Sequence, residues 1–113
     1  MVTLQELLDI EGVVAAVEFS LDGSLLDYEA KMDMSEEMAQ MTAQHCAAVS
    51  LMFNTLASSF TNQSGMNWVP QHTWVYSGGE WTACIGDAGK QGVLVETSKA
   101  DFNKVFEALG DER

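Results

Sequence analysis

The chain has 113 residues, of which 47% are hydrophobic and 19% charged, values typical of one globular domain covering residues 1–113. Seventeen acidic residues against five basic ones give a formal net charge of −12 at pH 7. Such a charge repels a nucleic-acid backbone and an anionic membrane, so we exclude both as partners. It leaves open an ordinary soluble acidic surface or a surface that attracts a basic partner protein.

The N-terminal residues and the cysteines indicate the compartment. The first residues include acids and no basic region, unlike a secretory signal. The longest apolar stretch, Ala47 to Phe60, is interrupted by polar side chains and is unlike a membrane span. Cys46 and Cys84 are far apart in the sequence, and no secretory context accompanies them. We therefore expect a cytoplasmic protein with two reduced thiols.

The first predicted elements are a short helix and a β-hairpin. Thr3 and Glu6 form a capping-box signature, and the leucines that follow lie on one side of a helix closed by Gly12. Residues 13–19 form a β-rich run, and the Asp22-Gly23 pair predicts a turn into a second strand.

A long helix is predicted next. Asp33-x-x-Glu36 is a second capping signature, and neither Pro nor Gly follows before Gly65, so we predict a helix of roughly 25 to 28 residues. Large apolar side chains and one histidine share one face of this helix, which we expect to pack on a sheet. They are Met34, Met38, Met41, His45, Val49, Met52, Leu56 and Phe60.

The opposite side of this helix is small and uncharged, although a solvent-exposed side would normally carry Glu and Lys. No Asp, Glu, Lys or Arg occurs from Met38 to Gly79. One monomer core cannot bury so long an uncharged stretch, so we predict that this side packs against a second copy of the chain. The interface residues expected on the helix are Ala43, Ala47, Ser50, Leu51, Asn54 and Ser58. The alternative is an Ala- and Ser-rich helix covered by a loop of its own chain.

Three strands and a last helix are predicted for the C-terminal part. Pro70 favours an edge position for the first of these strands, because proline lacks a backbone donor. Ser98 is the predicted cap of the last helix, whose apolar stripe ends at Leu109. The three strands are expected over residues 68–76, 81–85 and 93–97.

The tryptophans flank the first of these strands and its turn. Aromatic side chains concentrate at interface hot spots, so we assign Trp68 and Trp74 to the same predicted dimer interface. Ordinary core tryptophans are the alternative. The methionines near the start of the long helix are interpreted as core packing.

No residue pattern indicates catalysis, a cofactor or a metal. His45 and Cys46 are neighbours whose side chains point about 100° apart on a helix, while His72 and Cys84 lie on separate predicted strands. We therefore interpret His45 as a core histidine. The Gly86-x-x-Gly89-Lys90 segment resembles a phosphate loop but lacks its spacing and its Ser or Thr for magnesium, so we interpret it as a turn.

The predicted order α-β-β-α-β-β-β-α and the N-terminal pattern together resemble the Roadblock/LC7 (dynein light chain) superfamily. The pattern is Leu4-x-x-Leu7-x-x-Ile10-x-Gly12-Val13-x-Ala15-Ala16-Val17-x-Phe19-Ser20-x-Asp22-Gly23. The resemblance covers the whole chain by element order and is greatest to small prokaryotic members without an assigned activity. It implies an α+β fold with a five-stranded antiparallel sheet, the long helix on one face and the terminal helices on the other.

The resemblance also implies a function. Similar members homodimerise through the third strand and the long helix, the elements that are uncharged here. Relatives are non-enzymatic platforms that often regulate small Ras-like GTPases or scaffold motors and signalling complexes. We therefore expect a homodimeric scaffold without a cofactor, whose further partner is a small GTPase or another protein with a basic surface. Two alternatives stay open: a small-molecule sensor or carrier with a profilin-like or PAS-like fold, and a thiol-dependent enzyme using Cys46 or Cys84.

Overall fold

The computed structural model describes residues 3–68, 73–86 and 90–109. They form helices and strands in the order predicted from the sequence. The elements are α1 (Leu4–Leu8), β1 (Val13–Phe19), β2 (Leu25–Ala30), α2 (Glu36–Ser64), β3 (Trp74–Gly78), β4 (Trp81–Gly86), β5 (Gln91–Glu96) and α3 (Phe102–Leu109).

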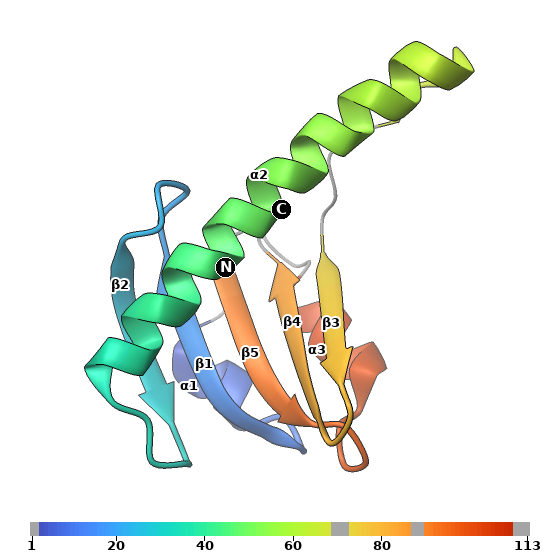
Figure 1. The fold of residues 1–113 in the computed structure, drawn as a ribbon. Helices are drawn as coiled ribbons and strands as arrows, with labels where there is room; N and C mark the ends of the chain where they lie inside the picture. Colours follow the sequence, from blue (N-terminus) through green and yellow to red (C-terminus); the bar gives the residue numbers. More distant parts are fainter. Residues whose placement is uncertain (1–2, 69–72, 87–89, 110–113) are drawn as a thin grey trace.

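The strands form one antiparallel sheet in the order β2-β1-β5-β4-β3, so β2 and β3 lie at its two ends. α2 crosses one face of this sheet, while α1 and α3 lie against the other face (Figure 1). These layers confirm the predicted α+β fold.

Each face of the sheet contributes to its own apolar cluster, because successive side chains of a strand point to opposite faces. Ala16 and Val93 pack with the buried leucines of α1 and α3. Ala15 and Val17 point the other way and pack with the small side chains of α2. The hydrophobic run of β1 therefore serves both clusters, as expected for a strand that is covered on both faces.

α2 is longer than the sheet that it crosses. Its N-cap is Ser35 rather than the predicted Asp33, and the Ser35 Oγ accepts a hydrogen bond from the Met38 amide at 3.1 Å. It ends at Gly65, whose φ of 74° is a left-handed conformation that suits glycine. Its 29 residues span about 44 Å, whereas the six residues of β2 span about 20 Å. The C-terminal part of α2 therefore projects beyond the sheet (Figure 1).

The predicted orientation of α2 is wrong, because its small side, and not its large apolar side, faces the sheet. Small side chains let the helix axis come close to the strands and to the β1–β2 turn. A Cβ on Gly23 would lie only 3.3 Å from the Gln44 Cα. The buried residues of α2 are Ala39, Ala43, Cys46, Ala47, Ser50 and Ala57.

The residues predicted to pack on the sheet divide into two groups. Met34 and Met38, at the start of α2, do pack with the cluster on this face. Met41, His45, Met52, Leu56 and Phe60 are instead exposed, and Val49 is half-buried. His45 is therefore not a core histidine, and its Nδ1 lies 2.9 Å from the Met41 carbonyl oxygen.

Two further details differ from the prediction. Asp101, rather than Ser98, accepts a hydrogen bond at the start of α3, from the Lys104 amide to Oδ1 at 3.3 Å. β3 begins at Trp74, well after the predicted start at Trp68. The predictions for Pro70 and His72 fall outside the described residues.

Candidate interaction surface

The part of α2 from Leu51 to Ser64, which we call the overhang, contains no charged residue. Most of its side chains are exposed, and Met52 is 69% exposed. Its exposed large apolar residues are Leu51, Met52, Leu56 and Phe60. An exposed apolar surface of this kind makes the overhang a candidate interaction site.

The chain that follows α2 turns back along the overhang. The Trp68 amide donates a hydrogen bond to the Thr61 Oγ1 at 2.9 Å, and the Thr61 hydroxyl lies 3.2 Å from the Trp68 carbonyl oxygen. The Phe60 and Trp68 rings are in contact, with centroids 4.8 Å apart. Trp68 is therefore held on the overhang while remaining exposed.

β3 is an edge strand, and it lies beside the part of α2 that comes just before the overhang. The Trp74 Nε1–H donates a hydrogen bond to the Ser50 Oγ at 2.9 Å, and the Trp74 ring meets Phe53 edge-on at 5.7 Å. Val75 and Tyr76 are exposed. In the part of the chain that the structure describes, no strand pairs with the outer edge of β3.

The predicted interface residues therefore separate into two sets. Ala43, Ala47 and Ser50 are buried against the sheet of their own chain, so they belong to the fold and not to an exposed surface. The prediction that this side of α2 points away from the sheet is wrong for them. Leu51, Asn54 and Ser58 lie on the overhang, Trp68 lies on the chain held against it, and Trp74 lies half-buried on β3.

Sequence reasoning missed several exposed residues of this surface. Met52, Leu56 and Phe60 were assigned to the core, and Val75 and Tyr76 were not assigned to the interface. The length of the predicted helix could have identified the first group. A helix of roughly 40 Å is longer than both the strands and the width of a five-stranded sheet, each about 20 Å, so its last turns must be exposed or covered by another molecule.

The two cysteines and the metal-ligating residue types were the remaining candidates for chemistry. Cys46 and Cys84 are free and buried, and burial raises the pKa of each thiol to about 11, which disfavours the reactive thiolate. In residues 3–68, 73–86 and 90–109, no group of three His, Cys, Asp or Glu side chains could hold a metal ion. Within the same ranges, no helix is long and apolar enough to cross a membrane.

The glycine-containing segment between β4 and β5 connects two adjacent antiparallel strands. The Lys90 amide donates a hydrogen bond to the Gly86 carbonyl oxygen at 3.1 Å. Gly89 lies outside the described residues. A phosphate loop would lead into a helix, whereas this segment leads into β5.

Comparisons with known proteins identify the fold and the family. The chain is similar to a Roadblock/LC7 domain from Streptomyces avermitilis, with 15% identity, a TM-score of 0.71, and 94% and 84% of the two chains covered. It is also similar to the gliding protein MglB from Thermus thermophilus, with 19% identity, a TM-score of 0.72, and 95% and 82% covered. An MglB structure described as having a tetrameric arrangement gives the same values.

These structural similarities confirm the Roadblock/LC7 resemblance at the level of the fold. No sequence among curated proteins matches the chain. A family model described as "Uncharacterized conserved protein (DUF2173)" matches residues 3–111. The chain therefore belongs to the DUF2173 family and has the Roadblock/LC7 fold.

Proposed function

We propose that this chain is a non-catalytic interaction module that forms a homodimer through β3 and the overhang. The observation that carries the proposal is the uncharged overhang, exposed beside an edge strand whose outer side is unpaired in the described residues. A homodimer would cover both features with one isologous contact, in which each surface meets its own copy.

The geometry favours extension of the sheet across a two-fold axis. Two antiparallel β3 strands would join two five-stranded sheets into one, which satisfies the backbone groups of both edges. α2 runs from the β2 side of the sheet toward the β3 side (Figure 1). The overhang of each copy would then pass the seam and bury Leu51, Leu56 and Phe60 against its partner, at about 1.5 to 3 kcal/mol for each fully buried side chain.

The resemblance supports a second protein partner for this dimer. Roadblock/LC7 relatives act as platforms, and a small Ras-like GTPase or another protein with a basic surface fits a chain of net charge −12. We place the module in the cytoplasm because its two cysteines are free, and we treat residues 1–113 as one domain because both apolar clusters share one sheet.

The alternative of a small-molecule carrier has less support. The cavity between α2 and the sheet, lined by Phe19, Cys46 and Leu94 among others, has a volume of only ≈ 10 Å³. That volume is about enough for one water molecule. A ligand in this position would need the helix to move away from the strands.

The test is the oligomeric state of two interface variants, Leu56→Glu on the overhang and Val75→Lys on β3. Sedimentation equilibrium at micromolar concentration should show a wild-type dimer, and each variant should raise the dissociation constant by at least about a hundredfold. Each substitution places two uncompensated charges across the two-fold contact. Both side chains are exposed in the monomer, so circular dichroism should be unchanged.

The matched control is Asn103→Glu, which adds the same charge as Leu56→Glu on the exposed side of α3, on the other face of the sheet. It should remain dimeric. A wild type that sediments as a monomer, or variants that dimerise as well as the control, would contradict the proposal.

A further inference from the structure

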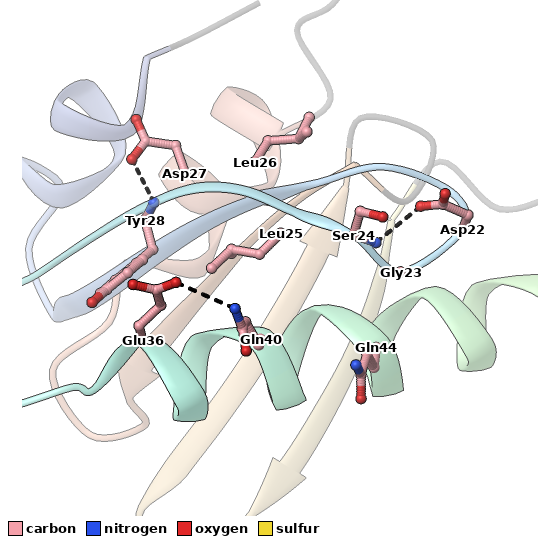
Figure 2. Close-up of a pocket in the computed structure, with 10 residues that line it drawn as sticks. All are labelled: Asp22, Gly23, Ser24, Leu25, Leu26, Asp27, Tyr28, Glu36, Gln40 and Gln44. Atoms are coloured by element: carbon pink, nitrogen blue, oxygen red, sulfur yellow. Dashed lines mark hydrogen bonds between the residues drawn. The ribbon is translucent and has the colours of Figure 1, made fainter.

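A groove of ≈ 700 Å³ lies at the end of the sheet opposite to β3, between β2 and the first turns of α2. Figure 2 shows Leu25 and Tyr28 pointing from β2 toward the helix, with Glu36 and Gln40 facing them from α2. Leu26 and Asp27 belong to the same strand, and their side chains point away from the helix (Figure 2). The groove therefore follows the outer edge of β2 over most of its length.

The edge of β2 is available for pairing. β2 is the last strand of the sheet on this side, so in the described residues only β1 pairs with it. Glu18 pairs with Asp27 and Phe19 with Leu25, which leaves Leu26 as a bulge residue without a partner in β1. Leu26 is 62% exposed and offers an apolar contact beside the groove.

One backbone donor on this edge is held by a side chain and not by a strand. The Tyr28 N–H donates to the Asp27 Oδ1 at 2.8 Å (Figure 2). A carboxylate in this position shields the edge from unwanted pairing. A lysine or arginine brought in by another strand would draw this carboxylate away and leave the Tyr28 N–H for a carbonyl oxygen of that strand.

The groove is acidic. Asp22, Asp27 and Glu36 line it, and none of the described lining residues is Lys or Arg. The Asp22 carboxylate accepts hydrogen bonds from the Ser20 hydroxyl and the Ser24 amide, which hold it at the turn. The Glu36 carboxylate accepts one from the Gln40 amide group at 3.3 Å. This set of charges repels acidic chains, a second copy of β2 included.

We propose that this groove binds an extended, lysine- or arginine-rich segment of a partner protein, which adds a strand to the edge of β2. Backbone hydrogen bonds to β2 would supply affinity, and alternating basic side chains would reach Glu36 on one side and Asp27 on the other. The aliphatic stems of those side chains would cover Leu26 and Tyr28. A metal ion is a poorer occupant, because the described residues contain no three-ligand cluster.

This binding does not depend on dimerisation. β2 and β3 lie at opposite ends of the sheet, so a dimer formed through β3 would leave both grooves open. The monomeric variant Leu56→Glu should therefore bind the same segment with unchanged affinity. A failure of the dimer proposal and a failure of this one would be separate results.

The experiment uses a labelled, capped peptide that alternates lysine with valine, and fluorescence anisotropy at physiological salt. The double variant Asp27→Asn with Glu36→Gln should weaken binding about tenfold or more, since two charge-assisted contacts are lost. Glu11→Gln with Glu107→Gln removes the same charge from exposed positions outside the groove and should change binding less than twofold. Thermal unfolding of both double variants should show that the fold is intact.

A second peptide tests the strand pairing itself. N-methylation on alternate residues blocks the amides of one peptide edge, so one of the two methylated registers should lose binding while the other retains it. Equal binding of both registers, equal weakening by the control variant, or no binding to the wild type would overturn the proposal.

Discussion

The two ends of the sheet differ in charge and in regularity. β3 and the overhang contain no charged residue. β3 pairs with β4 through five consecutive residues without a bulge. β2 includes Asp27 and Glu29 and carries a bulge at Leu26. Charges and bulges are the usual protection of an edge strand against uncontrolled pairing. β2 has this protection and β3 lacks it, a difference that supports the proposal of a partner at β3.

The largest effect is expected for a charge placed beneath α2. The small side of α2 packs on the sheet and is part of the fold. Ala47 is 3% exposed and contacts the sheet-side cluster, so Ala47→Glu would bury a carboxylate without a partner and should unfold the protein or lower its stability by several kcal/mol. Thermal unfolding followed by circular dichroism measures this loss.

Ala48→Glu is the matched control, because the neighbouring Ala48 is exposed on the same turn of α2. It should unfold within a few degrees of the wild type. If Ala47→Glu were equally stable and instead became monomeric, the small side of α2 would be an interface after all.

The next effect concerns the protection of β2. Replacing both acids of the strand, as in Asp27→Val with Glu29→Val, gives β2 the uncharged character of β3. We expect the double variant to form assemblies larger than the wild type at the same concentration, because an unprotected edge recruits further copies. Size-exclusion chromatography with light scattering checks this, and Asp27→Asn with Glu29→Gln, which keeps the side chains polar, should associate less. An unchanged size for the valine variant would show that the acids do not protect this edge.

A smaller effect is expected in thiol reactivity. Cys84 pairs in register with Val75 of β3, while Cys46 lies between α2 and the sheet. Burial raises the pKa of each from 9.0 to about 11, so the thiolate fraction at neutral pH falls about a hundredfold. Native protein should therefore react slowly with iodoacetamide, and unfolded protein much faster.

Both thiols are buried within one chain, Cys84 against α1 and α3 and Cys46 under α2. Loss of the partner in Val75→Lys should therefore leave the slow alkylation of both cysteines unchanged, as mass spectrometry of the peptides would show. Because the folded pKa is raised, the stability linked to these thiols is present below pH 9 and is lost as pH rises through about 11. Rapid reaction of either thiol in the native wild type at neutral pH would contradict this.

Local signals in the sequence were enough to predict the element order. The Thr3–Glu6 capping box is present as expected, with the Glu6 amide donating to the Thr3 Oγ1 and the Thr3 amide to the Glu6 Oε1. The Asp22-Gly23 turn and the Gly65 cap likewise depend on the conformations of a few adjacent residues. Each of these features is determined within one turn of the chain.

The orientation of α2 could not be predicted in the same way. Helical periodicity separates the side of α2 that carries Met41 and Met52 from the side that carries Ala43 and Ala47. Neither side carries a charge that would mark it as solvent-exposed. Which side faces the strands depends on how closely the helix approaches Ala15 and Val17, a property of the assembled layers. The interface prediction failed at the residues that the sheet covers and stays a prediction for those on the overhang.

The smallest effect is expected at the turn that shapes the acidic groove. Hydrogen bonds from the Ser20 hydroxyl and from Ser24 lower the pKa of Asp22, so folding stabilises its charged form. A lowered pKa in the folded state means that this stability is present above the ordinary value of 3.8 and is lost as pH falls through the folded value. Asp22 is solvent-exposed, so screening keeps the contribution small.

Asp22→Asn should therefore lower the melting temperature slightly at neutral pH, and the difference from the wild type should disappear in acid. Ser20→Ala removes the hydroxyl donor without changing the charge and should show the same loss at neutral pH. Melting curves recorded from neutral pH down to acid measure both differences. If the gap between wild type and Asp22→Asn widened on acidification, the carboxylate would not be stabilised in its charged form, and the β1–β2 turn would not hold that charge at the rim of the groove.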